Sequence, residues 1–173
     1  MQTTTNKRAL RKYDGRKHEW FHLAKTVVLT VIAVLIIAAF VVGFSRVDGN
    51  SMYPTLKNGQ AVAYLRVDRS IEYGDIVAIK MTSGEGYVKR VIGMPGDVIE
   101  LKDGCVYRNG DMLYEPYLAT QEVTEPEEDN VEYPYTVGEG TYFVLGDNRE
   151  HSTDSRAFGA VIKQNSKGVI LNQ

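Results

Sequence analysis

The sequence contains little cysteine and little histidine, and this scarcity argues against two kinds of site. Its 173 residues include one cysteine, Cys105, and three histidines. One thiol cannot form an internal disulfide, and we expect Cys105 to be a buried structural residue because no neighbouring group would stabilise a thiolate. His18 and His22 lie four residues apart without a third ligand in view. The sequence therefore predicts no metal site.

One segment lacks charge altogether. Residues 26–44, TVVLTVIAVLIIAAFVVGF, contain no charged residue, no proline and one glycine. As a helix this run would be about 28 Å long, close to the hydrocarbon thickness of a bilayer. A buried core helix would be expected to have a polar face. A cleaved signal peptide would have a shorter apolar region and a small-x-small site after it. We therefore predict a transmembrane helix over residues 26–44.

Basic residues are concentrated before this run. Residues 1–25 contain seven Lys and Arg and two acidic residues, whereas the rest of the chain has 13 basic and 20 acidic residues. Because basic flanks stay in the cytoplasm, residues 1–25 should form a cytoplasmic segment and residues 45–173 an extracytoplasmic domain. We interpret the basic segment as an orientation signal and expect no nucleic acid partner.

After the apolar run, short segments rich in Val, Ile and Tyr alternate with turn dipeptides such as Asp103-Gly104 and Asn109-Gly110. Residues 115–140 contain Pro, Gly and many acidic residues, and we expect a solvated surface excursion there. The pattern predicts a mainly β, antiparallel domain. Strands are expected over residues 61–65, 75–80, 86–93, 97–101, 105–110 and 141–146.

Two residues could form a nucleophile and its base. Ser51 lies in GNSMYPTL, but a serine hydroxyl needs a base, and His151 is the only histidine after the apolar run. Lys89, in GYVKRVIG, would share a strand face with Tyr87. Partial desolvation there would lower the pKa of the amine below about 10.4 and make it a competent base. The alternative is a solvated lysine at a sheet edge, which would discourage aggregation.

A polar stretch, GDNREHSTDSRAFG, occupies residues 146–159. One interpretation is a loop stabilised by its own hydrogen bonds and by pairing of Asp154 with Arg156. The other is a site whose hydroxyl groups orient Lys89. The composition does not choose between them.

Four segments, in this order after one anchor, resemble the successive boxes of bacterial type I signal peptidases (serine peptidase family S26). They are DGNSMYPTL, YGDIVAIK, YVKRVIGMPGD and FVLGDNREHSTDSRAFG. The resemblance extends over about residues 45–162 and thins through residues 112–140. The related endoplasmic-reticulum enzymes have histidine at the position of Lys89, so the chain is similar to the bacterial type. The resemblance implies a β-rich domain with a smaller inserted β region, here residues 98–141.

The resemblance also implies roles for single residues. Ser51 matches the nucleophile, whose backbone N–H would donate to the oxyanion. Lys89 matches the general base, and Ser152 matches the hydroxyl that orients its amine. Supporting members of the site would be Asp147, Arg149, Asp154 and Arg156. Walls of shallow pockets for small side chains would be Met52, Leu56, Tyr87 and Val88.

Two positions depart from the family pattern. Gly49 stands where some members have a serine whose hydroxyl also donates to the oxyanion, and the loss of one such donor costs about 3 kcal/mol. A backbone N–H, a water or another hydroxyl would have to replace it. His151 stands where the family often has asparagine, and a Ser51–His151 mechanism is the rival to one that uses Lys89.

The implied activity is hydrolysis of signal peptides from exported preproteins after small-x-small (Ala-x-Ala) sites, through an acyl-enzyme and without metal or cofactor. Ser51 follows Phe44 by seven residues, a reach of about 25 Å, so it should lie near the outer surface of a bacterial cell membrane. The expected partners are preprotein signal peptides, the bilayer and a nearby secretion translocon. The alternatives are a peptidase dedicated to few substrates, a non-catalytic membrane-tethered assembly factor, and a self-cleaving Ser–Lys protein of the repressor type.

Overall fold

The apolar run forms part of one helix in a computed structural model, which describes residues 3–66, 70–81, 84–119, 123–127 and 131–171, with side chains from residue 19 onward. Helix α1 covers Thr3–Val41, and its segment Glu19–Val41 is exposed, long enough and apolar enough to cross a bilayer. Residues 42–44 of the predicted span begin strand β1 instead. There Gly43 lies against the ring of Tyr64, where any larger residue would clash.

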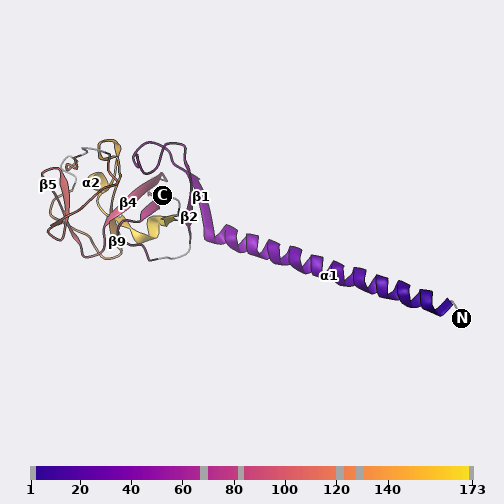
Figure 1. The fold of residues 1–173 in the computed structure, drawn as a ribbon. Helices are drawn as coiled ribbons and strands as arrows, with labels where there is room; N and C mark the ends of the chain where they lie inside the picture. Colours follow the sequence, from indigo (N-terminus) through magenta and orange to yellow (C-terminus); the bar gives the residue numbers. More distant parts are fainter. Residues whose placement is uncertain (1–2, 67–69, 82–83, 120–122, 128–130, 172–173) are drawn as a thin grey trace. The chain divides into compact units, whose positions relative to one another are not determined.

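The chain divides into two units, residues 1–41 and 42–173, and the second contains two antiparallel sheets (Figure 1). In the described part of the chain, the larger sheet has the order β1-β2-β11-β3-β4-β9-β10 and the smaller sheet the order β7-β6-β5-β8. The prediction of a mainly β, antiparallel domain is therefore confirmed.

The strands of the larger sheet are β1 (Val42–Arg46), β2 (Ala61–Leu65), β3 (Ile76–Lys80), β4 (Gly86–Gly93), β9 (Thr141–Leu145), β10 (Val161–Ile162) and β11 (Ser166–Ile170). Those of the smaller sheet are β5 (Val98–Lys102), β6 (Cys105–Arg108), β7 (Asp111–Met112) and β8 (Tyr135–Thr136). All four lie within residues 98–141, where the family resemblance implies an inserted β region. Three short helical turns complete the described elements: η1 (Arg149–His151), α2 (Ser155–Phe158) and η2 (Lys163–Asn165).

The larger sheet is buried on both faces near its centre, which explains the continuous apolar run in β3. Ile76 and Ala78 belong to a first buried cluster, and Val77 and Ile79 belong to a second. A third cluster joins the two sheets through residues such as Ile99 and Phe143. Cys105 on β6 is partly exposed, so the expectation of a buried cysteine is wrong.

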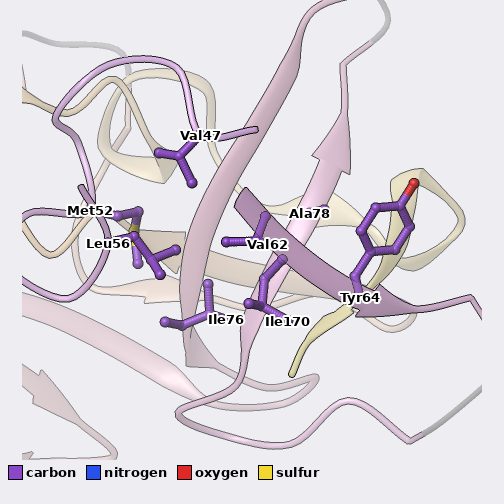
Figure 2. Close-up of a cluster of buried hydrophobic side chains, with 8 residues drawn as sticks. All are labelled: Val47, Met52, Leu56, Val62, Tyr64, Ile76, Ala78 and Ile170. Atoms are coloured by element: carbon purple, nitrogen blue, oxygen red, sulfur yellow. The ribbon is translucent and has the colours of Figure 1, made fainter. Parts of the chain in front are cut away.

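The first cluster anchors the turn that contains Ser51 (Figure 2). Met52 and Leu56, from this turn, are almost completely buried beside Val62 and Ile76 of the larger sheet. Burying each of these side chains stabilises the fold by about 1.5–3 kcal/mol. The turn is therefore held on the sheet by apolar side chains that follow Ser51 in the sequence.

Candidate active site

Ser51 is fastened by its backbone to the polar stretch that follows β9. Its carbonyl oxygen accepts a hydrogen bond from Asn148 N at 3.0 Å. Asn148 Nδ2 donates to the carbonyl oxygen of Asn50 at 3.1 Å. Gly49 has a φ of +87° and its N–H donates to Asn58 Oδ1 at 3.1 Å. Since a side chain at this φ would be strained, the backbone favours the glycine that departs from the family pattern.

Gly146 is the point at which three segments meet. A Cβ atom at this residue would lie 2.5 Å from both the Cβ of Ser152 and the carbonyl oxygen of Ser51. Strand β4 pairs with β9 from Arg90 and Leu145 onward. Extending this antiparallel register by one residue would bring Lys89 opposite Gly146. The missing side chain of Gly146 leaves room for the carbonyl group of Ser51 and the side chain of Ser152.

Lys89 is buried: only 1% of its surface is exposed. Its Nζ lies 5.5 Å from the ring centroid of Tyr87, and Val77 is opposite Lys89 across the strand pair. Burial lowers the pKa of the amine to about 8, a shift opposed by Asp154 and assisted by Arg156. A solvated lysine at a sheet edge is thus excluded, and a substantial neutral fraction exists near pH 8.

Asp147, the residue after Gly146, is paired with an arginine. Arg90 Nε donates to its Oδ1 at 2.8 Å and Arg90 Nη2 donates to its Oδ2 at 2.7 Å. The same Oδ2 accepts from Thr55 Oγ1 at 2.5 Å. One buried carboxylate therefore ties the turn after Ser51 to the strand that carries Lys89.

Asp154 is the second buried carboxylate, and it is also paired. Arg156 Nε donates to its Oδ1 at 2.9 Å, and Ser152 Oγ donates to its Oδ2 at 2.8 Å. The N–H of Gly146 donates to the same Oδ2 at 3.0 Å. Ser152 uses its only proton in this bond, so its oxygen presents lone pairs to an approaching amine or ammonium group.

Part of the acidic segment over residues 115–140 is buried and structural rather than solvated. Arg149 Nη2 donates to Glu115 Oε1 at 2.6 Å, Arg149 Nη1 donates to Thr124 Oγ1, and these three side chains are almost completely buried. Glu127 Oε1 lies 3.5 Å from Arg156 Nη2. The expectation of a wholly solvated excursion over residues 115–140 is wrong at these positions, because its carboxylates pair with buried arginines. Its residues 120–122 and 128–130 lie outside the described residues.

A groove of about 90 Å³ begins at Ser51. It is well below the 300–1,000 Å³ of sites that take drug-sized ligands. The lining of this Ser51 groove includes Met52, Tyr64, Ala78, Tyr87 and Val88. Leu56 is fully buried beneath it and is not among the described residues that line it.

The structure brings most of the expected residues together. Ser51, Ser152 and Asp154 are linked through Gly146, whereas His151 is exposed on η1. Among the described residues, no group of three or more His, Cys, Asp or Glu side chains could hold a metal ion. The sequence reasoning missed several residues that support the site. For one of them a local signal existed, since it is charged and lies within the apolar strand β4. The missed residues are Arg90, Thr55, Gly146, Glu115 and Thr124.

Comparisons with known proteins identify relatives over nearly the whole chain. The family model described as "Signal peptidase, peptidase S26" matches residues 20–171. A signal peptidase I of Bacillus licheniformis is 37% identical over 167 residues, which cover 91% of this chain and 89% of the relative. Signal peptidase I S of Bacillus subtilis is 39% identical over 150 residues, which cover 80% of this chain and 77% of the relative. The crystal structure of a signal peptidase I from Enterococcus faecalis is 35% identical with a TM-score of 0.52, covering 60% of this chain and 98% of that structure.

Replacing Lys89 with methionine should stabilise the protein in a pH-dependent way. Between the folded pKa of about 8 and the unfolded value of 10.5, the unfolded wild type binds more protons, so its stability rises with pH. Below pH 8 the buried amine costs up to about 3 kcal/mol. Lys89→Met should therefore increase the free energy of unfolding at pH 6.5, and the gain should shrink towards pH 10.

Denaturant unfolding of the full chain in detergent at both pH values measures this difference. Lys80→Met, at an exposed lysine on the neighbouring strand, is the matched control and should show no such pH dependence. An identical response of the two variants would contradict the assignment of a buried, destabilised amine at Lys89.

Proposed function

Because the chain belongs to the peptidase S26 family, as a bacterial type I signal peptidase, we propose that it cleaves signal peptides with Ser51 as nucleophile and Lys89 as general base. The observation that carries this proposal is the burial of Lys89, next to the residue at which β4 begins to pair with the end of β9, the strand that leads into Gly146 and the polar stretch bonded to Ser51. A buried amine with a lowered pKa can accept the proton that a serine hydroxyl must lose.

The reaction then proceeds in two steps. Neutral Lys89 takes the proton of Ser51 Oγ as this oxygen attacks the scissile carbonyl, and the backbone N–H of Ser51 donates to the oxyanion. The C–N bond breaks, the Lys89 ammonium protonates the leaving amine, and an acyl-enzyme remains on Ser51. Water, activated by neutral Lys89, hydrolyses this ester. Ser152 accepts a hydrogen bond from the ammonium and thereby holds Nζ in place.

The substrate lies extended along the edge of β4 that has no strand partner among the described residues. The pairing of β4 with β9 begins at Arg90, and residues 86–88 pair with β3 on their other side. An added strand could therefore bond to this edge, with alternate side chains turned towards the Ser51 groove. The small volume of the groove agrees with an Ala-x-Ala specificity, because alanine is the side chain that such narrow pockets accept.

The apolar segment Glu19–Val41 and the family membership indicate membrane anchoring. We place the basic N-terminal residues in the bacterial cytoplasm and the β domain outside the cell membrane. Preproteins would then be delivered by a neighbouring secretion translocon, with the cleavage site just beyond the bilayer. This arrangement needs neither a cofactor nor a nucleic acid partner.

Cleavage of a preprotein with an Ala-x-Ala site by the full chain in detergent tests this function. Ser51→Ala should abolish the acyl-enzyme, and Lys89→Ala should lower kcat/KM by about 10²–10⁴-fold, the usual contribution of a general base. For wild type, kcat/KM should rise with pH and level off above the Lys89 pKa of about 8. His151→Ala should keep this profile; a profile that follows a group near pH 6.5 and vanishes in His151→Ala would establish histidine as the base.

Gly146→Ala should displace Ser51 relative to Lys89 and thereby lower the rate. The new Cβ would collide with the Ser51 carbonyl and with Ser152, and a displacement of about 1 Å near reacting atoms costs about 100-fold in rate. The measured quantity is kcat for the same preprotein. Gly138→Ala, where the nearest atom would be 3.6 Å away, is the control and should be as active as wild type. An unchanged kcat in Gly146→Ala would show that these segments do not have to meet at this point.

A further inference from the structure

Arg90 is held along its edge by hydrogen bonds and on its face by a tyrosine of the inserted region. Its Nε and Nη2 donate to Asp147, and its Nη1 donates to the carbonyl oxygen of Gly74 at 2.9 Å. The ring of Tyr117 covers the flat face of the guanidinium group, with 4.0 Å between the ring centroid and Arg90 Cζ. A cation is attracted to an aromatic face, and more strongly when the pair is removed from water. Arg90 is only 7% exposed, so this contact is of the stronger kind.

The Tyr117 ring is itself held from its other end. Its hydroxyl group donates to Glu115 Oε1 at 2.6 Å, and the same oxygen accepts from Arg149 Nη2 at 2.6 Å. Arg149 Nε in turn donates to the carbonyl oxygen of Gly146 at 2.8 Å. The ring also packs against the third buried cluster. The position of the ring is therefore determined on two sides.

These contacts close a loop that begins and ends in the polar stretch after β9. The members of the loop, in order, are Gly146, Arg149, Glu115, Tyr117, Arg90 and Asp147. The first and the last are neighbours in sequence, whereas Glu115 and Tyr117 come from the inserted region. The inserted region is thus connected to Asp147 through the face of one aromatic ring.

The consequence for Lys89 follows from the pairing of Asp147. A carboxylate whose guanidinium partner is held in place attracts a nearby ammonium group less than one whose partner can turn into water. Without the ring, Asp147 would act more strongly on Lys89 and favour its charged form. The charged and aromatic groups that act on Lys89 are Asp154, Arg156, Asp147, Glu127 and Tyr87. Those that act on Arg90 are Asp147, Tyr117 and Tyr73.

We propose that Tyr117 is a positioning residue of the active site: its ring holds Arg90 against Asp147, so that Asp147 stays neutralised near the strand that contains Lys89. This inference rests on the proposed function, since it assigns a support to the same base. The hydroxyl group of Tyr117 is secondary in this role, because Glu115 keeps its bond to Arg149 without it.

The test follows the titration of Lys89 in variants of the full chain in detergent. Tyr117→Leu removes the aromatic face and should raise the pH midpoint of the Lys89 amine by about half a unit. The kcat/KM profile for the Ala-x-Ala preprotein should move to higher pH by the same amount, so that kcat/KM at pH 7 falls about threefold. Tyr117→Phe keeps the face and loses only the hydroxyl group, and it should titrate as wild type does.

Two comparisons distinguish positioning from general loosening of the fold. Leu113→Ala, which also removes packing against the third cluster, should lower the free energy of unfolding and leave the Lys89 midpoint unchanged. Arg90→Lys keeps the charge without the flat face. In the Arg90→Lys background Tyr117→Leu should raise the midpoint little further, because both changes break the same contact. If Tyr117→Leu does not fold, Tyr117→Met, whose flexible side chain adapts to the space, should give the same shift.

NMR of the Lys89 amine in a Ser51→Ala background separates this inference from the proposed function, because it needs no catalysis. A wild type that cleaves no preprotein would contradict the proposed function alone. A midpoint that stays in place without the Tyr117 ring, or that moves equally in Tyr117→Phe or in Leu113→Ala, would overturn the role of Tyr117 alone.

Discussion

The site depends on one energetic constraint: an amine is buried in a sheet whose nearby carboxylates are already paired. Asp147 is bonded to Arg90, and Asp154 is bonded to Arg156. Each pair is close to neutral, so neither carboxylate acts as a full counter-ion for Lys89. Burial is then the largest influence on the amine and lowers its pKa to about 8. If either arginine were absent, the freed carboxylate would favour the charged lysine, which cannot accept a proton.

The polar stretch after β9 explains how segments distant in the sequence are joined around β4, the strand that contains this amine. Gly146 allows the close approach, Asp147 holds the turn after Ser51, and Asp154 holds Ser152. Arg149 adds a connection to the inserted region through Glu115. These groups are buried and hydrogen-bonded, so the site is largely organised before a substrate arrives. In the mechanism that we propose, pre-organisation of this kind would allow Ser51, as a weak nucleophile, and Lys89, as a single base, to act together.

Most of the fold could be predicted from the sequence, because its strands have strong local signals. The strands over 61–65 and 86–93 have the predicted bounds. The β1 strand was missed because its apolar residues continue the helical run, and β11 was missed because Gly168 and Lys167 interrupt a short strand. Strand β1 is defined by its pairing with β2, and strand β11 by its pairing with β2 and β3.

The site was only partly accessible to sequence reasoning. The local sequence pattern did not decide whether Lys89 is a general base or a solvated lysine. The family resemblance, not periodicity, indicated the role of a base. The arginine beside it depends on Asp147, 57 residues further along the chain, a contact that no local pattern contains. The same holds for the β-bulge in β11 between Ser166 and Gly168, since an alternating pattern cannot reveal a bulge. Long-range pairing and register are therefore what the structure adds.

The central claim is that Lys89 is a neutral base at mildly alkaline pH. The most direct measurement is an NMR titration of the lysine side-chain amines in the full chain in detergent, with the Lys89 signal assigned by its loss in Lys89→Met. The account predicts a midpoint near pH 8, well below that of the exposed lysines. A Lys89 signal that titrates with them, near the ordinary value of about 10.4, would contradict it.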